Sequence, residues 1–330
     1  MKAKLISQIS HKGRVFLHTK IPLKTPLVVF VESSGFCNLK CKFCPHGTGE
    51  NFKKDLMSIK LFEKLVKDLS IFPDKLKLLR FCGDGDSLVN KNIVQFTQLA
   101  KEKKIAEKVE MITNGVLLHT DLIKNLPRFL DRIIISIEGL NTQDYQRISG
   151  TKIDYQRFLD NLHALYTNKN KCKIHIKINN EAVSSDKKKV KFFNMFGDIC
   201  DEINIENLVS MWPQFKTSFS TNQFRFGGKI IKRQVCVQIF KSLQVQADGE
   251  VVPCCVDWNR VNLLGNIKRN SLLEIWNGKK IRNLQIKHLQ GKKGTLETCK
   301  DCSMNDYCDT DNIDLYRKEC LKRLSQHHEN

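Results

Sequence analysis

Six short runs of β-branched and apolar residues alternate with amphipathic stretches between Leu27 and Asn207, and this alternation constrains the fold most strongly. A strand followed by a helix, repeated several times, produces right-handed crossovers and a parallel sheet. The expected strands are Leu27–Glu32, Leu76–Cys82, Lys108–Ile112, Arg132–Ile137, Lys173–Ile178 and Glu202–Glu206. We therefore expect an α/β fold whose sheet curves into a partial (β/α)6 barrel, with its chemistry beyond the carboxyl ends of the strands.

The stretches between these runs repeat their apolar residues with the period of a helix. In the first of them, Leu61, Leu65 and Leu69 fall on one face. The expected helices include Ile59–Leu69, Ile93–Lys103, Tyr155–Tyr166 and Lys188–Phe196.

The strand and helix pattern breaks between Trp212 and Gly228, and we interpret this stretch as a linker. We predict an extension at residues 1–26, a barrel at 27–225 and a small, irregular, cysteine-rich domain at 226–330. In the last of these, Leu243–Gln246 and Glu250–Val252 flank Asp248-Gly249 and predict a hairpin. So small a domain usually needs a metal to hold it together.

The chain has thirteen cysteines, an odd number, and its amino terminus lacks the apolar stretch of a signal peptide. No apolar run is long enough to span a membrane. These features predict a cytoplasmic protein, where clustered cysteines at short spacings indicate metal rather than disulfides. Cys82, Cys172 and Cys200 stand in apolar contexts and are interpreted as core residues.

The formal charge of +20 is carried by dispersed lysines and arginines. It is compatible with nucleic acid, an acidic partner or a phosphorylated substrate. No nucleic-acid recognition motif accompanies it, so we interpret the charge as a solvated surface and do not expect a nucleic-acid partner.

The first group of cysteines, Cys37, Cys41 and Cys44, has C-x3-C-x2-C spacing and follows the first expected strand. Three thiolates on one loop can each bind one iron of a cubane cluster and leave the fourth iron open to a substrate. A zinc site that uses these thiols with His46 is the alternative, but zinc ligands usually come as two separated C-x2-C pairs.

This segment resembles the radical S-adenosylmethionine (SAM) superfamily, whose signature is C-x3-C-x-aromatic-C; Phe43 is the aromatic residue. The resemblance implies a 4Fe–4S cluster with an open iron that binds the amino and carboxylate groups of SAM. An electron from the cluster then releases a 5′-deoxyadenosyl radical. It also implies an external electron donor such as flavodoxin or ferredoxin.

Three further stretches resemble landmarks of this superfamily and follow successive expected strands: Gly83–Asn90, Thr113–Gly115 and Ser136–Gly139. The resemblance implies that SAM is bound by Gly83, Gly85, Asp86, Asn114 and Ser136. Asp86 replaces the usual glutamate as the acceptor for the methionine ammonium, and Ser87 replaces proline. Asp84 is an alternative acceptor.

The second group of cysteines is spread over the last hundred residues and comprises Cys236, Cys254, Cys255, Cys299, Cys302, Cys308 and Cys320. The pattern C-x12-G-x4-C at Cys236, Gly249 and Cys254 resembles the extension called SPASM, or its shorter form, the twitch domain. After Cys308 and three intervening residues comes Asn312, where a full SPASM pattern has cysteine. This departure favours a single auxiliary 4Fe–4S cluster over two.

Two sets of ligands compete for that cluster. The twitch-like set is Cys236, Cys254, Cys299 and Cys302; the other is Cys299, Cys302, Cys308 and Cys320. We favour the first because it ties both ends of the domain together, which leaves Cys255, Cys308 and Cys320 as weaker candidates. Four thiolates close a cluster to substrate and suit electron transfer. A zinc site remains an alternative here too.

The spacing in the second group resembles that of the aminocyclitol and sugar dehydrogenases of the butirosin and spectinomycin pathways. The resemblance implies oxidation of a small polar substrate, from alcohol to ketone, with the auxiliary cluster accepting an electron. The sequence does not identify the base that removes the hydroxyl proton. The alternative is modification of a ribosomally made peptide, which the short stretch before Cys37 disfavours.

Overall fold

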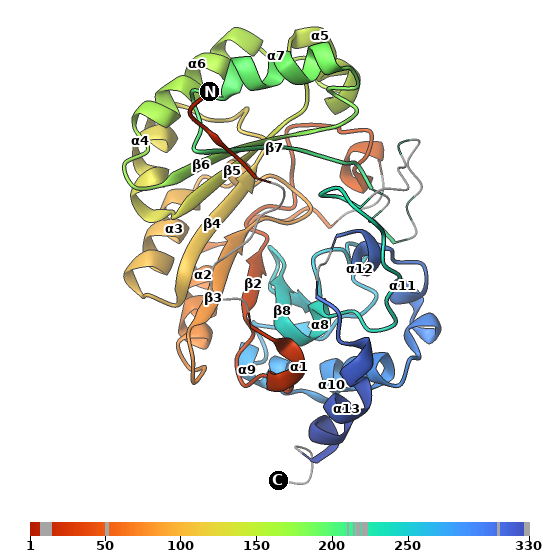
Figure 1. Ribbon diagram of the computed structural model, residues 1–330. Helices are drawn as coiled ribbons and strands as arrows, with labels where there is room; N and C mark the ends of the chain where they lie inside the picture. Colours follow the sequence, from red (N-terminus) through yellow and green to blue (C-terminus); the bar gives the residue numbers. More distant parts are fainter. Residues whose placement is uncertain are drawn as a thin grey trace.

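The computed structural model of the 330-residue chain describes residues 1–6, 15–49, 53–209, 211–213, 215, 219, 224–308 and 311–326. In these ranges the strands form one sheet with the order β1-β7-β6-β5-β4-β3-β2-β8-β9-β10 (Figure 1). Their bounds are β1 Lys4–Leu5, β2 Val28–Val31, β3 Leu76–Phe81, β4 Ala106–Thr113, β5 Arg132–Ile137, β6 Lys173–Asn179, β7 Glu202–Glu206, β8 Ser242–Val245, β9 Glu250–Val252 and β10 Gly265–Asn266. From β7 to β2 each strand is parallel to its neighbour, which confirms the expected α/β fold.

The centre of the sheet is apolar on both faces, as parallel sheets covered by helices usually are. Ile133, Ile134 and Ile135 of β5 are fully buried, and β-branched residues of this kind pack well on a pleated surface. Ile135 pairs with Ile176 of β6, which continues the buried layer into the next strand.

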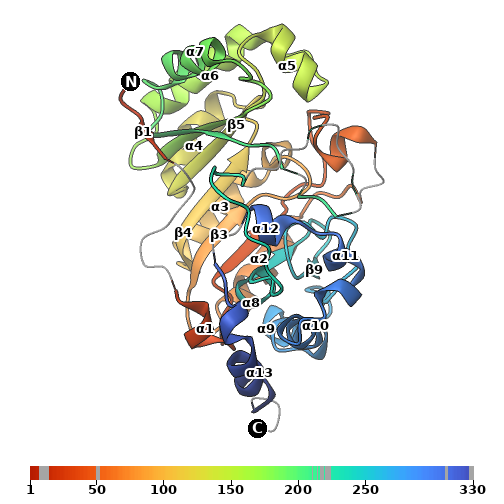
Figure 2. The same cartoon turned by 45° about the vertical axis from the view of Figure 1, so that its right-hand side comes forward.

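Helices α2 to α7 cover the outer face of this curved sheet (Figures 1 and 2). The α-helices are α1 Leu17–Lys20, α2 Ile59–Leu69, α3 Ile93–Glu102, α4 Thr120–Phe129, α5 Thr142–Ser149, α6 Tyr155–Thr167, α7 Asp186–Phe196, α8 Gln238–Lys241, α9 Leu272–Trp276, α10 Lys279–Leu289, α11 Glu297–Lys300, α12 Met304–Tyr307 and α13 Arg317–Gln326. Short 3-10 helices are η1 Pro45–Thr48, η2 Ser87–Val89, η3 Lys293–Thr295 and η4 Asp314–Tyr316. The expected helix at 188–196 begins earlier, because the Ser185 side chain caps it by accepting a hydrogen bond from the Lys188 amide.

The expected hairpin forms, but it does not stand apart from the barrel. β8 pairs in parallel with β2, with Val29 opposite Leu243, and β9 then pairs antiparallel with β8. Gly249 closes the hairpin with a φ of +88°, a conformation that favours glycine. The sheet is therefore continuous across the predicted boundary at residue 225, and the division into domains stays a prediction. Much of the predicted linker lies outside the described residues.

The predicted N-terminal extension touches both ends of the molecule. β1 pairs with β7 at one edge of the sheet. α1 packs against α13, where Arg323 donates to the carbonyl of His18 and the His18 and Tyr316 rings stack with centroids 3.9 Å apart. β1 and α13, the last described helix, lie at opposite ends of the molecule (Figures 1 and 2). Within the described ranges, no helix is long and apolar enough to cross a membrane.

Candidate metal centres

The first cysteine loop, which carries Cys37, Cys41 and Cys44, connects β2 to η1. Its backbone is fixed by α5, because the amides of Lys40 and Lys42 donate to carbonyls at the end of that helix over 2.8 and 3.1 Å. All three thiols are partly buried. The loop thus stands beyond the carboxyl end of β2, where the strand pattern predicts it.

The electrostatics of this loop oppose thiolate formation unless a cation is bound. Burial raises the pKa of Cys37 to about 12, and the Asp86 carboxylate adds to the effect. Burial also raises the pKa of Cys44 to about 11. A metal binds thiolates and displaces their protons, so the positive charge of iron would reverse these shifts.

The Asp86 carboxylate joins two of the landmark turns. It accepts hydrogen bonds from the Leu88 amide at 2.9 Å, the Thr113 hydroxyl at 2.9 Å and the Asn114 amide at 2.8 Å. These donors hold Asp86 in place and fix the Gly83–Asn90 stretch against the end of β4. Its predicted contact with the methionine ammonium would come in addition to these bonds and stays a prediction.

Asn114 connects these turns to the cysteine loop. Its side-chain amide donates to the Asn38 side chain at 2.8 Å and lies 3.9 Å from the Cys37 sulfur. The structure therefore brings together Cys37, Asp86 and Asn114. Ser136 is partly buried near the end of β5, and its predicted role stays a prediction.

At the two landmark glycines, other parts of the same chain pack closely against the backbone. A Cβ at Gly83 would lie 2.9 Å from the Glu32 carboxylate, and one at Gly85 would collide with the carbonyl oxygens of Ser34 and Phe36. Between them, Asp84 is buried, and no hydrogen-bond donor among the described residues reaches its carboxylate oxygens. The carboxylate of Asp84 is therefore more available than that of Asp86 to accept a hydrogen bond from a ligand. Asp84 stays the alternative acceptor for the methionine ammonium.

A buried polar network at the carboxyl ends of β5 to β7 was missed by the sequence analysis. Glu206 forms ion pairs with Lys177 and with Arg225, the latter at 3.0 Å. Burial alone would raise the pKa of Glu206, but Arg225 and Lys177 lower it to about 2. Nearby, burial raises the pKa of Glu138 to about 7. The signal in the sequence was a lysine that alternates with isoleucines within a predicted strand.

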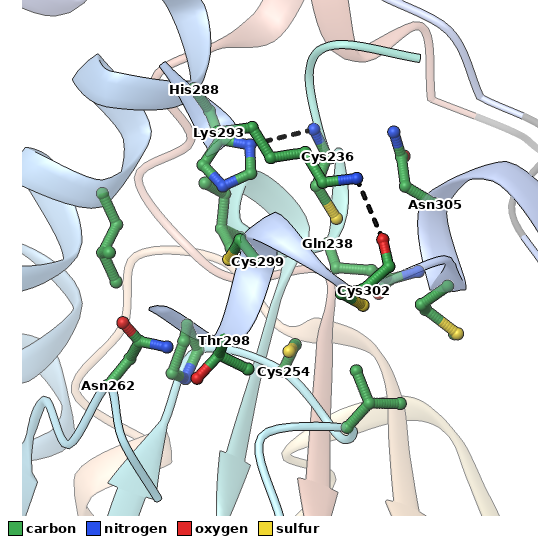
Figure 3. A pocket seen from close by; sticks show the side chains of 15 residues that line it. Cys236, Gln238, Cys254, Asn262, His288, Lys293, Thr298, Cys299, Cys302 and Asn305 are labelled. Carbon is green, nitrogen blue, oxygen red and sulfur yellow. Dashed lines mark hydrogen bonds between the residues drawn. The ribbon is translucent and has the colours of Figure 1, made fainter. Parts of the chain in front are cut away.

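Four cysteines of the second group line a single cavity, which Figure 3 shows from close by. Cys236 precedes α8, Cys254 follows β9, Cys299 belongs to α11 and Cys302 follows it. Burial raises the pKa of Cys299 to about 12, with Cys236 and Cys302 as further contributors. These are the four thiols of the twitch-like set.

The side chains around this cavity fit an iron–sulfur cluster. Four thiols are the usual protein ligands of a 4Fe–4S cluster. The cavity is also lined by His288, whose ring nitrogen Nε2 is buried and finds no hydrogen-bond partner within the described ranges. Within the described residues, no group of three or more His, Cys, Asp and Glu side chains is placed to hold a single metal ion, so the zinc alternative gains no support.

Of the weaker candidates, Cys255 and Cys308 do not line the cavity, but both are close enough to Cys302 to contribute to its raised pKa. Cys255 is within electrostatic reach of Cys82 and Cys308 and does not line the cavity. Cys320 is buried against α1, with its sulfur 3.6 Å from the carbonyl oxygen of His18. The structure therefore does not bring Cys320 to the thiols of the cavity, which the second ligand set requires.

The comparisons with known protein families match both regions. Residues 31–179 match the Radical SAM superfamily, and residues 236–303 match SPASM, an iron–sulfur cluster-binding domain. These two domains imply SAM and iron–sulfur clusters as cofactors.

The chain is also similar over most of its length to known proteins. It is 20% identical to the S-adenosyl-L-methionine-dependent 2-deoxy-scyllo-inosamine dehydrogenase of Niallia circulans, over 84% of this chain and 92% of that protein. The crystal structure of BtrN with AdoMet and 2-DOIA matches with a TM-score of 0.57 and 20% identity, over 84% of this chain and 92% of that one.

The structure of Streptococcus suis SuiB bound to its precursor peptide SuiA matches with a TM-score of 0.65 and 14% identity, over 88% and 73% of the two chains. At such identities the structural matches establish the fold alone. The family follows from the two matched domains together with the cysteine loop and cavity described above. The chain is a radical SAM superfamily enzyme with a SPASM iron–sulfur cluster-binding domain.

Proposed function

We propose that this enzyme oxidises a hydroxyl group of a small polar aminocyclitol or sugar to a ketone. In this proposal Cys37, Cys41 and Cys44 hold the cluster that cleaves SAM. One auxiliary 4Fe–4S cluster is held by Cys236, Cys254, Cys299 and Cys302. The observation that carries the proposal is the cavity lined by these last four thiols, because a cluster with four protein ligands suits electron acceptance.

When bound, SAM and the two clusters would supply a 5′-deoxyadenosyl radical that takes one hydrogen atom from the carbinol carbon, and an acceptor for the electron left behind. The hydroxyl proton leaves to a base, so one alcohol and one SAM give one ketone, 5′-deoxyadenosine, methionine and a proton. The electron that starts each cycle is returned. Binding one C–H bond in the right orientation is the main task of the protein.

The chain offers polar groups for such a substrate at the carboxyl ends of its strands. Lys177, Glu206 and Arg225 form a buried network there, and Glu138 stands nearby. Buried charged groups of this kind can donate to and accept from the hydroxyl and ammonium groups of an aminocyclitol. The name of the Niallia circulans relative, a dehydrogenase of 2-deoxy-scyllo-inosamine, supports the same substrate class.

The first electron would come from an external donor such as flavodoxin or ferredoxin. Such donors are acidic proteins, and the formal charge of +20 on this chain is complementary to them.

The proposal is tested by anaerobic reconstitution followed by turnover with 2-deoxy-scyllo-inosamine and related aminocyclitols and sugars. We expect about eight irons per chain, from two cubane clusters. We also expect one 5′-deoxyadenosine for each ketone formed. With substrate deuterated at the carbinol carbon, mass spectrometry should find the deuterium in 5′-deoxyadenosine.

Two results would contradict the proposal. About four irons together with bound zinc would remove the auxiliary electron acceptor. Formation of 5′-deoxyadenosine without a ketone from any of these compounds, but with a mass change in a precursor peptide, would favour the peptide-modifying alternative instead.

A further inference from the structure

His288 connects α10 to the cavity of the four thiols. The side chain is fully buried, and its Nδ1 accepts a hydrogen bond from the backbone amide of Cys236 at 3.1 Å. The other ring nitrogen, Nε2, is also buried, and no residue in the described part of the chain is its hydrogen-bond partner. Figure 3 shows the ring at the wall of the cavity, with the bond to Cys236 drawn as a dashed line.

The bond to Cys236 determines where the imidazole carries its hydrogen. A backbone N–H can only donate, so Nδ1 must present a lone pair. A neutral imidazole with an unprotonated Nδ1 carries its hydrogen on Nε2, and an imidazolium has no lone pair to accept with. The nitrogen without a partner in the cavity wall is therefore an N–H donor.

Several other donors around the cavity are engaged, whereas the side-chain nitrogen of Asn262, like His288 Nε2, is buried with no hydrogen-bond partner among the described residues. The Lys293 ammonium donates to the carbonyl of Cys302 at 3.0 Å, and the Thr298 hydroxyl donates to Asp257 at 3.1 Å. The side-chain amide of Asn305 donates to the Val235 carbonyl at 3.1 Å. A buried donor left without an acceptor destabilises the folded state, so the Nε2–H group calls for an acceptor inside the cavity.

We infer that His288 donates its Nε2–H to a sulfur of the auxiliary cluster or of a coordinating cysteine, and thereby raises the reduction potential of that cluster. The inference rests on the proposed function, which supplies the cluster. A hydrogen bond to sulfur stabilises the reduced cluster, which carries one more negative charge, more than the oxidised one. His288 thus makes the cluster a better electron acceptor, and its bond to the Cys236 amide also positions the first ligand.

His288 does not act as an iron ligand in this arrangement. Ligation through Nε2 would need the lone pair that the hydrogen occupies. Its role is that of a positioning residue which acts on the substrate through the cluster.

The experiment measures the potential of the auxiliary cluster in the full chain carrying Cys37→Ala, Cys41→Ala and Cys44→Ala, so that the first cluster contributes no signal. The cluster is titrated with a reductant, and electron paramagnetic resonance monitors its reduction. The titration is repeated after His288→Leu and His288→Gln are each introduced separately into this parent. We expect His288→Leu to lower the one-electron reduction equilibrium constant about tenfold, which corresponds to about 59 mV. His288→Gln keeps an N–H donor at a similar reach, so it should stay within about twofold of the parent.

His175→Leu is the matched control. His175 is also a fully buried histidine, and one of its nitrogens has no partner among the residues that the structure describes. Its other nitrogen pairs with Asn204 in the barrel, away from the cavity. Its removal should leave the potential unchanged. An equal fall of the potential in His175→Leu and His288→Leu would overturn the inference, because the effect would then be general loosening of the protein.

Iron content separates the failure of this inference from the failure of the proposed function. If the parent binds no iron, the auxiliary cluster itself is absent. If it binds about four irons per chain and His288→Leu leaves the potential unchanged, the His288 inference alone is wrong. Pulsed resonance on the parent with 15N-labelled histidine needs no variant at His288. A weak nitrogen coupling is expected, while no coupling, or the strong coupling of a bound imidazole, would overturn the inference.

Discussion

The two groups of cysteines are built in opposite ways. Cys37, Cys41 and Cys44 stand on one continuous loop at the carboxyl end of β2. The four thiols of the cavity come from separate segments between Cys236 and Cys302 and meet only because those segments pack around them. A local loop can present three ligands and leave one iron open, whereas a site assembled from several segments can enclose its metal completely.

The surroundings of the two groups differ in the same sense. Asn114 and Asp86 link the first loop to turns at the ends of neighbouring strands, where a substrate can approach. The cavity of the second group is lined by four of its thiols together with His288 and Lys293. We therefore expect cysteine substitutions in the two groups to have different effects. Substitutions in the first group should abolish radical formation, and substitutions in the second should remove the electron acceptor.

The largest effect is expected from Cys37→Ala, Cys41→Ala and Cys44→Ala combined. Without these thiols there is no cluster to cleave SAM, so 5′-deoxyadenosine should fall to the background level while iron falls from about eight to about four per chain. Liquid chromatography and iron analysis measure both quantities. Persistent 5′-deoxyadenosine in this variant would refute the assignment of the first loop.

Cys254→Ser should separate the two steps of the reaction. The open cluster remains, so 5′-deoxyadenosine should still form, but ketone should fall to background because the auxiliary cluster is lost or altered. Iron should fall toward about four per chain. Cys172→Ser is the control, since Cys172 is a buried core thiol outside both groups, and it should leave the iron content unchanged. Undiminished ketone formation in Cys254→Ser would show that the second group accepts no electron.

The sequence predicted the first group better than the second for a physical reason. The spacing of Cys37, Cys41 and Cys44 is local, and the six strands follow from runs of β-branched residues that any parallel sheet must bury. The pairing of Val29 with Leu243 joins segments that are far apart in the sequence, and no local period reports such a contact. The four thiols of the cavity were selected through a resemblance and not through geometry.

The buried groups that complete the sites were missed for a related reason. His288 is one histidine on a short amphipathic helix, and its bond to the Cys236 amide exists only in the folded chain. Lys177 and Glu206 are charged residues on strands, which sequence patterns assign to a solvated face unless their partner is known. Arg225 stands in the stretch that we interpreted as a linker, although it pairs with Glu206.

Glu206→Gln tests whether the ion pairs of Glu206 stabilise the contact between the barrel and the segment beside the cavity. Arg225 reaches from the Glu206 ion pair to the carbonyl of Tyr307, so the network ties β7 to the segment beside the cavity. Removing one charge leaves the buried Lys177 and the partly buried Arg225 without their counter-ion, which should lower the free energy of unfolding by about 3 kcal/mol. Asp186→Asn is the control, because its ion pair with Lys189 is exposed and should change the free energy of unfolding little.

The ion pairs of Glu206 also predict how the free energy of unfolding changes with pH. Arg225 and Lys177 lower the pKa of Glu206 from 4.5 to about 2 despite its burial. The unfolded chain therefore binds the proton first, and the stabilisation by Glu206 is complete above pH 4.5 and is lost as the pH falls toward 2. Urea unfolding of the wild type and of Glu206→Gln should differ by a constant amount from pH 5 to 8 and converge in acid. A difference that grew in acid would contradict the predicted role of the ion pairs.

The smallest effect is expected from Gly85→Ala, which disturbs the first loop through its packing and not through its ligands. A Cβ there would collide with the carbonyl oxygens of Ser34 and Phe36, so the strand ends must move apart at a cost of about 1–3 kcal/mol. Gly294→Ala, beside the cavity, is the matched control because no atom of the described residues lies within 4 Å of its added Cβ. Since the first loop is held by neighbouring backbone, Gly85→Ala should weaken SAM binding, measured calorimetrically, while the potential of the auxiliary cluster stays unchanged. If SAM binding and the potential of the auxiliary cluster changed together, the two groups would be coupled mechanically through the continuous sheet. The two groups would then differ only in how the chain provides their cysteine ligands.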